Sequence, residues 1–184
     1  MIQQPSPSYN FTITRSHNVS SPTTTTKLQT NTLPSILIDF TAMTLCDLMP
    51  TRPVTRRRSL PELVFFVQKI THLAQINART LLVALIYLQR AKSNLPKRAV
   101  GGDDTNHRMF LGALLLASKF LKDTTWTTST LSNRRIYEIC GGLFSPQDIC
   151  QLELAFLKLI QYNCWVDDQT LNNFVELHRA DFSL

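Results

Sequence analysis

The hydrophobic pattern is densest between residues 107 and 123, where the sequence is HRMFLGALLLASKFLKD. Apolar residues cover more than one face of the helix that this spacing predicts, and such a helix must be surrounded by other helices. Lys119 lies among the apolar positions, inside the charged residues at the two ends of the run, although a buried ammonium needs an acceptor or an opening to the surface. We therefore expect residues 107–123 to be the central helix of an all-α domain. Close approach of its neighbours is allowed by four small residues: Gly112, Ala113, Ala117 and Ser118.

A second apolar helix is predicted after Ser145, and it also carries one unexplained charge. Ser145 is a suitable N-cap, with Pro146 at the first helical position and Asp148 at the third. Glu153 interrupts the apolar positions that follow. A single cation and a single anion on two core-like helices suggest a pair with Lys119. The pair is either an internal salt bridge or part of a groove that binds something outside the chain, and the two residues alone do not decide between these alternatives.

Four further helices complete the predicted domain. The first begins at Ser59, which forms a capping box with Glu62, and the next extends from a cap at Asn77 to about Asn94. A short helix over residues 132–140 is stopped by two glycines. A last helix is predicted beyond residue 167. The scarcity of Gly and the absence of alternating apolar positions argue against a β-sheet.

The first 58 residues differ from the rest of the chain. Residues 1–32 are rich in Ser, Thr and Pro, and we expect them to be disordered because they bury too little apolar surface to offset chain entropy. Residues 33–58 contain a possible short helix that docks on the domain, followed by a basic linker that ends in three Arg. The apolar face of this helix is predicted from Ile36, Leu37, Phe40, Met43 and Leu48.

The charge of the chain is unevenly distributed. The 184 residues carry a net charge of +6, but residues 1–58 alone contribute +4, with six Lys and Arg against two Asp and Glu. The remaining residues are nearly neutral, which argues against nucleic acid as a partner. No apolar run has the roughly 20 residues that a membrane-spanning helix needs. With no signal peptide at Met1, we expect a protein of the nucleus or the cytoplasm.

The sequence offers no catalytic or metal-binding constellation. The cysteines form no C-x-x-C pair and lie at no metal-ligand spacing from a His. We predict that they are reduced and mostly core thiols: Cys46, Cys140, Cys150 and Cys164. No Gly-rich phosphate loop and no Ser/His/Asp arrangement is present at local spacing. We therefore expect a protein that is not an enzyme and that needs no cofactor.

From about Ser59 to Val166, the chain resembles a cyclin box, a domain of five helices with the third at its centre. HRMFLGALLLASKFLKD resembles the third helix of cyclins, with Lys119 in an A-S-K-F setting, and SPQDICQLELAFLKLIQYNCWV resembles the fifth, with Glu153 in an L-E-x-x-F-L setting. The His-Arg pair before the third helix, the N-x-R-x-Y stretch from Asn133, and GGLFSPQDI are most similar to fungal PCL-type (PHO-type) cyclins. On this basis we expect domain boundaries at 59–166 for the box and 167–184 for an additional helix.

The resemblance implies that the chain is the regulatory subunit of a cyclin-dependent protein kinase. In cyclins, the Lys of the third helix and the Glu of the fifth lie on the kinase-facing surface and bond to backbone groups around the regulatory helix of the kinase. The residues that would form this surface are Lys119, Phe120, Glu153, Leu157, Tyr162 and Cys164. The resemblance thus implies a partner kinase of the PHO type and no catalytic site in this chain.

Two features depart from the family, and two alternatives stay open. Ile136 stands where many PCL-type cyclins have a Trp, and the first helix lacks the Met-Arg-x-x-Leu docking patch of mitotic cyclins. One alternative is a transcription protein with a cyclin fold, which would need a basic surface. The other is a helical scaffold in which Lys119 and Glu153 pair internally and no kinase is activated.

Overall fold

The structure, a computed structural model, describes residues 33–52, 60–125 and 131–182, all within one unit, Asn31–Leu184. The predictions for the tail 1–32, for the three Arg before residue 59 and for a capping bond from Ser59 fall outside these residues. The described residues form an all-α fold with a single isolated bridge, between Thr51 and Gly101. The helices are α1 (Ser35–Cys46), α2 (Leu63–Leu73), α3 (Ala78–Asn94), α4 (Thr105–Thr125), α5 (Asn133–Cys140), α6 (Pro146–Leu159) and α7 (Asp168–Leu177).

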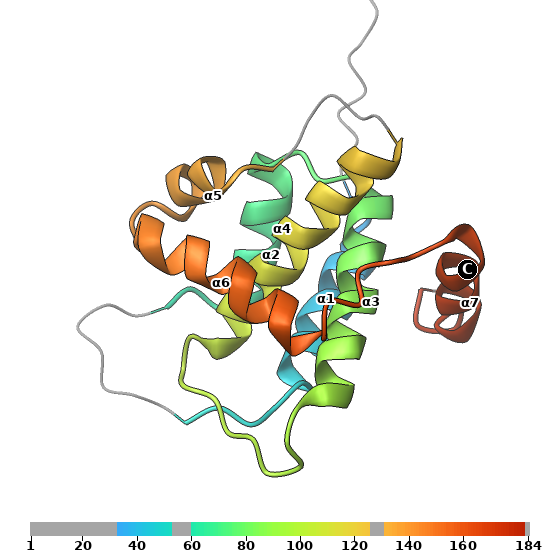
Figure 1. The fold of residues 1–184 in the computed structure, drawn as a ribbon, viewed down its shortest axis with the longest axis horizontal. Helices are drawn as coiled ribbons and strands as arrows, with labels where there is room; N and C mark the ends of the chain where they lie inside the picture. The colour runs from blue at the N-terminus through green and yellow to red at the C-terminus, as the bar shows by residue number, and fades with distance from the viewer. Residues whose placement is uncertain (1–32, 53–59, 126–130, 183–184) are drawn as a thin grey trace, which may run out of the picture. The chain divides into compact units, whose positions relative to one another are not determined.

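Helix α4 is the centre of the fold, as its apolar sequence predicts. It contacts α1, α2, α3 and α6, and Figure 1 shows α6 crossing in front of it with α3 behind. Its side chains are fully buried on several faces, including Phe110, Leu111, Leu114 and Leu115. The two remaining helices pack at the periphery. Helix α5 packs on α2 and α6, and α7 packs on α3.

Most helix ends are where the capping residues predict them. Asn77 accepts a hydrogen bond from the backbone N–H of Thr80 at the start of α3. At the start of α6, Ser145 and Asp148 form the complete reciprocal capping box, with Pro146 at the first helical position. Helix α5 ends at Gly141, whose left-handed backbone, with φ of 61°, is the conformation that glycine adopts without strain.

The predicted start of the first box helix is wrong. Helix α2 begins at Leu63, and its N-cap is Glu62, which has an extended backbone and makes no side-chain capping bond. Pro61 disfavours helical backbone at Leu60, the residue before it. The carbonyl of Pro61 instead pairs with His107 Nε2 at 2.9 Å, so this segment is tied to the N-terminal end of α4.

Helix α1 forms and packs on α2, α3 and α4, but its predicted inner face is partly wrong. Ile36 and Met43 are exposed, by 40% and 65%, whereas Leu45 is fully buried. Thr41 is also fully buried, and its hydroxyl donates to the carbonyl of Leu37 at 2.7 Å. This bond removes most of the cost of burying a hydroxyl, so a polar residue lies on the inner face and the apolar pattern alone misplaces it.

Candidate functional site

The candidate site lies where α4 and α6 cross, and a glycine sets how closely the two helices approach. A Cβ atom at Gly112 would lie 2.8 Å from the Cβ of Phe156. The backbones of α4 and α6 therefore come closer than any larger residue at position 112 would allow. This close approach is what brings residues further along the two helices within bonding distance of each other.

Lys119 of α4 and Glu153 of α6 form an ion pair. Lys119 Nζ lies 2.6 Å from Oε1 and 2.6 Å from Oε2 of Glu153. Asn133, the first residue of α5, contacts both charges, since its Oδ1 accepts from Lys119 at 3.4 Å and its Nδ2 donates to Glu153 Oε2 at 3.2 Å. The start of α5 is held in place by α4, because the backbone N–H of Leu131 donates to the buried Ser118 hydroxyl at 2.9 Å. Three helices thus contribute to one polar cluster.

The ion pair is at the surface and not in the core. The Lys119 side chain is 41% exposed and that of Glu153 is 18% exposed. Surface ion pairs typically stabilise a fold by no more than about 1 kcal/mol. The ion pair by itself therefore adds little to the stability of the fold. A carboxylate also offers about four acceptor positions, so Glu153 can accept a further N–H from another molecule.

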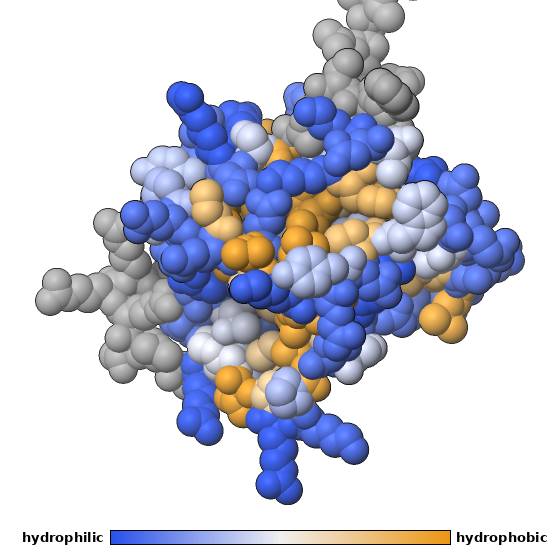
Figure 2. All heavy atoms as spheres, viewed as in Figure 1, coloured by the Kyte–Doolittle hydropathy of each residue, from blue (hydrophilic) through white to orange (hydrophobic). Residues whose placement is uncertain are grey.

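Apolar residues stand near the two charges in the sequence. Phe120 and Leu157 are half-buried against the core, and Tyr162 is 62% exposed on the turn that follows α6. Leu154, beside Glu153 in the sequence, is 51% exposed. Figure 2 shows apolar surface in the middle of this view, over α4 and α6, within a mainly polar rim. A partly desolvated ion pair with exposed aromatic neighbours has the composition of a protein-binding hot spot.

Sequence reasoning missed two residues of this surface. Trp165 is 68% exposed, and its ring meets the edge of Phe120 with the ring centres 6.1 Å apart. Asn133 is visible in the sequence only as the first residue of the N-x-R-x-Y stretch, and nothing there indicates its contacts with the ion pair. Trp165 could have been found in the sequence only from its position directly after Cys164, a predicted surface residue. The structure places Cys164 half-buried against the core.

The prediction that the cysteines are mostly core thiols is wrong for two of them. All four are free, but Cys46 and Cys150 are exposed and only Cys140 is buried. Cys46 is the last residue of α1, and Cys150 lies on the outer side of α6, where it accepts from Asn133 Nδ2 at 3.6 Å. Burial raises the pKa of Cys140 to about 11, so this thiol stays protonated at neutral pH.

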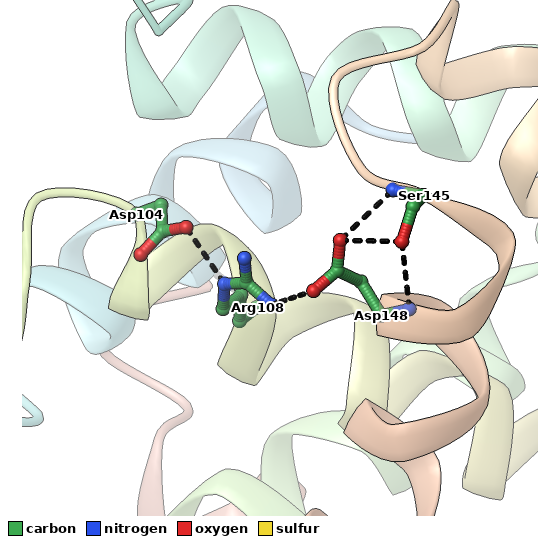
Figure 3. A network of polar contacts seen from close by, with 4 residues as sticks. All are labelled: Asp104, Arg108, Ser145 and Asp148. Carbon is green, nitrogen blue, oxygen red and sulfur yellow. Dashed lines mark hydrogen bonds and ion pairs between the residues drawn. The ribbon is translucent and has the colours of Figure 1, made fainter. Parts of the chain in front are cut away.

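A second polar network joins the N-terminal ends of α4 and α6 (Figure 3). Arg108 Nε donates to Asp104 at 2.7 Å, and its Nη1 donates to Asp148 at 3.3 Å. Asp148 also accepts from the hydroxyl and the backbone N–H of Ser145, and these two bonds, with help from Arg108, lower the pKa of its carboxyl. The guanidinium of Arg108 lies 5.0 Å from the ring centre of Phe144. This network fixes the helix crossing at the end away from Lys119.

In the described parts of the chain, no group of His, Cys, Asp and Glu is arranged to hold a metal ion. Within the same residues, none of the helices combines the length and the hydropathy that crossing a membrane requires.

Helices α2 to α6 form a five-helix domain around α4, which is the architecture of a cyclin box. Residues 36–164, more than half of the chain, match the cyclin N-terminal domain family, and the chain therefore belongs to the cyclin family. The match includes most of α1. The all-α fold and the resemblance to cyclins expected from the sequence are confirmed.

Three yeast proteins are similar to this chain, all cyclins of Saccharomyces cerevisiae. PHO85 cyclin-1 is 33% identical over 112 residues, which are 61% of this chain and 38% of that protein. PHO85 cyclin-9 is 37% identical over 84 residues, 43% of this chain and 28% of that protein. PHO85 cyclin-2 is 27% identical over 111 residues, 60% of this chain and 34% of that protein. The aligned region spans well under half the length of each relative. The expected similarity to PHO-type cyclins is confirmed by these three matches.

Proposed function

We propose that this chain binds and activates a cyclin-dependent kinase of the Pho85 type. The observation that carries the proposal is the ion pair of Lys119 and Glu153, held by Asn133 and close in the sequence to exposed apolar side chains. Membership of the cyclin family and the names of the three yeast relatives support it. The kinase-facing surface in this proposal consists of Lys119, Phe120, Glu153, Leu157, Tyr162 and Cys164.

The mechanism is a shift in the conformational population of the kinase. The free kinase mostly holds its regulatory helix in an inactive placement, and the cyclin binds the active placement more tightly. That helix carries a Glu that must pair with the catalytic Lys of the kinase. Lys119 and Glu153 bond to backbone groups around the helix, and the apolar residues beside them exclude water. The cyclin thus completes the active site of its partner and contributes no catalytic group of its own.

The test is a binding measurement between the purified chain and purified yeast Pho85. We expect the wild-type chain to form a complex, and we expect Lys119→Ala and Glu153→Ala each to weaken it by about 2–5 kcal/mol, because truncation leaves a desolvated partner group unpaired. Failure of the wild-type chain to bind Pho85 and other cyclin-dependent kinases of its own cell would contradict the proposal.

A second candidate is a helical scaffold that activates no kinase. The observation that favours it is that Lys119 and Glu153 already satisfy each other within the chain, at 2.6 Å. A double-mutant cycle distinguishes the two functions. Coupling between the two residues in kinase binding supports the cyclin function, whereas coupling seen only in the stability of the isolated chain supports the scaffold.

A further inference from the structure

The turn after α6 has an unusual backbone at two residues. Gln161 and Tyr162 both adopt left-handed conformations, with φ of 53° and 59°. Residues other than glycine hold such conformations only where surrounding contacts fix them, because each costs of order 1 kcal/mol or more. Local bonds supply such contacts here, because the backbone N–H groups of Gln161 and Tyr162 donate to the carbonyls of Lys158 and Leu157 at the end of α6, at 2.9 and 3.0 Å.

Helix α3 holds the residues that follow this turn. Arg90 donates through Nη1 to the carbonyl of Asn163 at 2.7 Å and through Nη2 to the carbonyl of Trp165 at 2.9 Å. One turn earlier on α3, the Tyr87 hydroxyl donates to the carbonyl of Cys164 at 2.6 Å. Three successive carbonyls are thus bound by two side chains of one helix. The planar guanidinium suits this task because its donors are fixed relative to each other.

Trp165 is presented outward by this arrangement. Its carbonyl is bound by Arg90, while its ring is 68% exposed and rests edge-on against Phe120, the neighbour of Lys119. A large aromatic ring that is exposed yet already fixed loses little conformational entropy when another protein covers it. Such rings are over-represented among the residues that dominate binding energy.

We propose that Trp165 contacts the kinase directly, under an apolar or aromatic kinase side chain, and that Arg90 is its positioning residue. The inference rests on the proposed function, whose surface already includes Tyr162 and Cys164, and it adds Trp165 to that surface. Arg90 acts through the backbone carbonyl of Trp165 and does not itself touch the kinase.

A fluorine NMR experiment tests the contact. The chain has two tryptophans, Trp126 and Trp165, so Trp126→Phe leaves a single site for fluorotryptophan. We expect the resonance of the labelled ring to shift and broaden when unlabelled Pho85 is added. If Pho85 binds and the resonance stays where it was, the inference is overturned while the proposed function stands. If Pho85 does not bind the wild-type chain, both are overturned.

Affinity measurements provide the second test, with all variants made in the full chain. We expect Trp165→Ala to weaken Pho85 binding by about tenfold or more. Phe65→Ala is the matched control, since Phe65 is a similarly exposed aromatic, by 61%, on α2. Equal affinity of Trp165→Ala and wild type would overturn the inference.

The positioning role predicts a specific coupling. We expect Arg90→Met to weaken Pho85 binding when Trp165 is present and to have little further effect in the Trp165→Ala background. Arg90→Lys keeps the charge but lacks the two-nitrogen fork, so we expect an intermediate affinity and a fold as stable as the wild type in thermal unfolding. Equal losses from Arg90→Met in both backgrounds would overturn the positioning role.

Discussion

Lys119 and Glu153 contribute little to the stability of the isolated chain. Both side chains are partly exposed, and an ion pair in that setting stabilises a fold by no more than about 1 kcal/mol. A bound kinase would exclude water from the same two charges. Removing either charge would then leave its partner group desolvated and unpaired, which weakens binding more than it weakens the fold. Under the proposed function, the pair therefore stabilises the complex more than it stabilises the fold, and this difference is measurable.

This difference predicts that Lys119→Met separates stability from binding. We expect the free energy of unfolding to change by no more than about 1 kcal/mol, while Pho85 binding weakens by about 2–5 kcal/mol. Chemical denaturation and titration calorimetry measure the two quantities. The matched control is Arg79→Met, because Arg79 forms an exposed ion pair with Asp168 at the same distance, 2.6 Å, between α3 and α7.

Arg79→Met is expected to leave kinase binding unchanged. A large loss of stability in Lys119→Met with unchanged binding would show that the pair is structural and would favour the scaffold.

Asp148 predicts an acid dependence of stability. Bonds from Ser145, supported by Arg108, lower its folded pKa below the ordinary 3.8. A lowered folded pKa means that the stabilisation is fully present above 3.8 and is lost as the pH falls through the folded pKa. We expect unfolding free energy, measured by denaturation at several pH values, to fall less steeply with acid below about pH 4 in Asp148→Asn than in the wild type. Identical slopes would show that Asp148 contributes nothing to the acid dependence.

At the scale of helices, the crossing of α4 and α6 depends on the missing side chain at Gly112. Alanine has a better intrinsic helix propensity than glycine, by about 1 kcal/mol. Here the added Cβ would meet the Cβ of Phe156 at 2.8 Å, and a Cβ cannot rotate away. The steric conflict should therefore outweigh the gain in propensity.

We expect Gly112→Ala to lower the free energy of unfolding by about 1–3 kcal/mol in chemical denaturation. The control is Gly102→Ala, where the added Cβ would meet nothing closer than 3.7 Å. Wild-type or higher stability of Gly112→Ala would contradict the close approach of the two helices.

Helix α1 offers a test of its buried face. Leu45 is fully buried whereas Met43 on the same helix is 65% exposed. We expect Leu45→Ala to cost about 2–5 kcal/mol in chemical denaturation, and Met43→Ala to stay within about 0.5 kcal/mol. Equal effects would mean that α1 does not pack on the domain through this face.

The sequence predicts most of these elements because their signals are local. Ser145 with Pro146 and Asp148, or Asn77 before α3, carry the start of a helix within three residues. The inner face of α1 could not be predicted, because its buried Thr41 is tolerated only through a bond to its own helix. The late start of α2 is not predicted either, and the carbonyl of Pro61 just before it is bound by His107, from a distant part of the chain.

At the scale of the whole molecule, the chain contains a cyclin domain, and the proposed function assigns one of its faces to a kinase. The sequence suggests that Lys119 and Glu153 belong together, because each interrupts the apolar positions of a core-like helix. It does not predict the contacts of Asn133 or Trp165, since these depend on how α5 and the turn after α6 are held against other helices. The centre of the site is thus visible in the sequence, and its edges require the tertiary structure.

The most direct test of the account is a kinase assay with purified Pho85, in which the chain is titrated and phosphate transfer from ATP to a peptide is measured. We predict that the wild-type chain raises the rate to a saturating level. The double variant Lys119→Met, Glu153→Gln should fail to do so at the same concentrations, while it unfolds at a temperature close to that of the wild type. Equal activation by both chains would contradict the assigned surface, and no activation by the wild-type chain would contradict the proposed function itself.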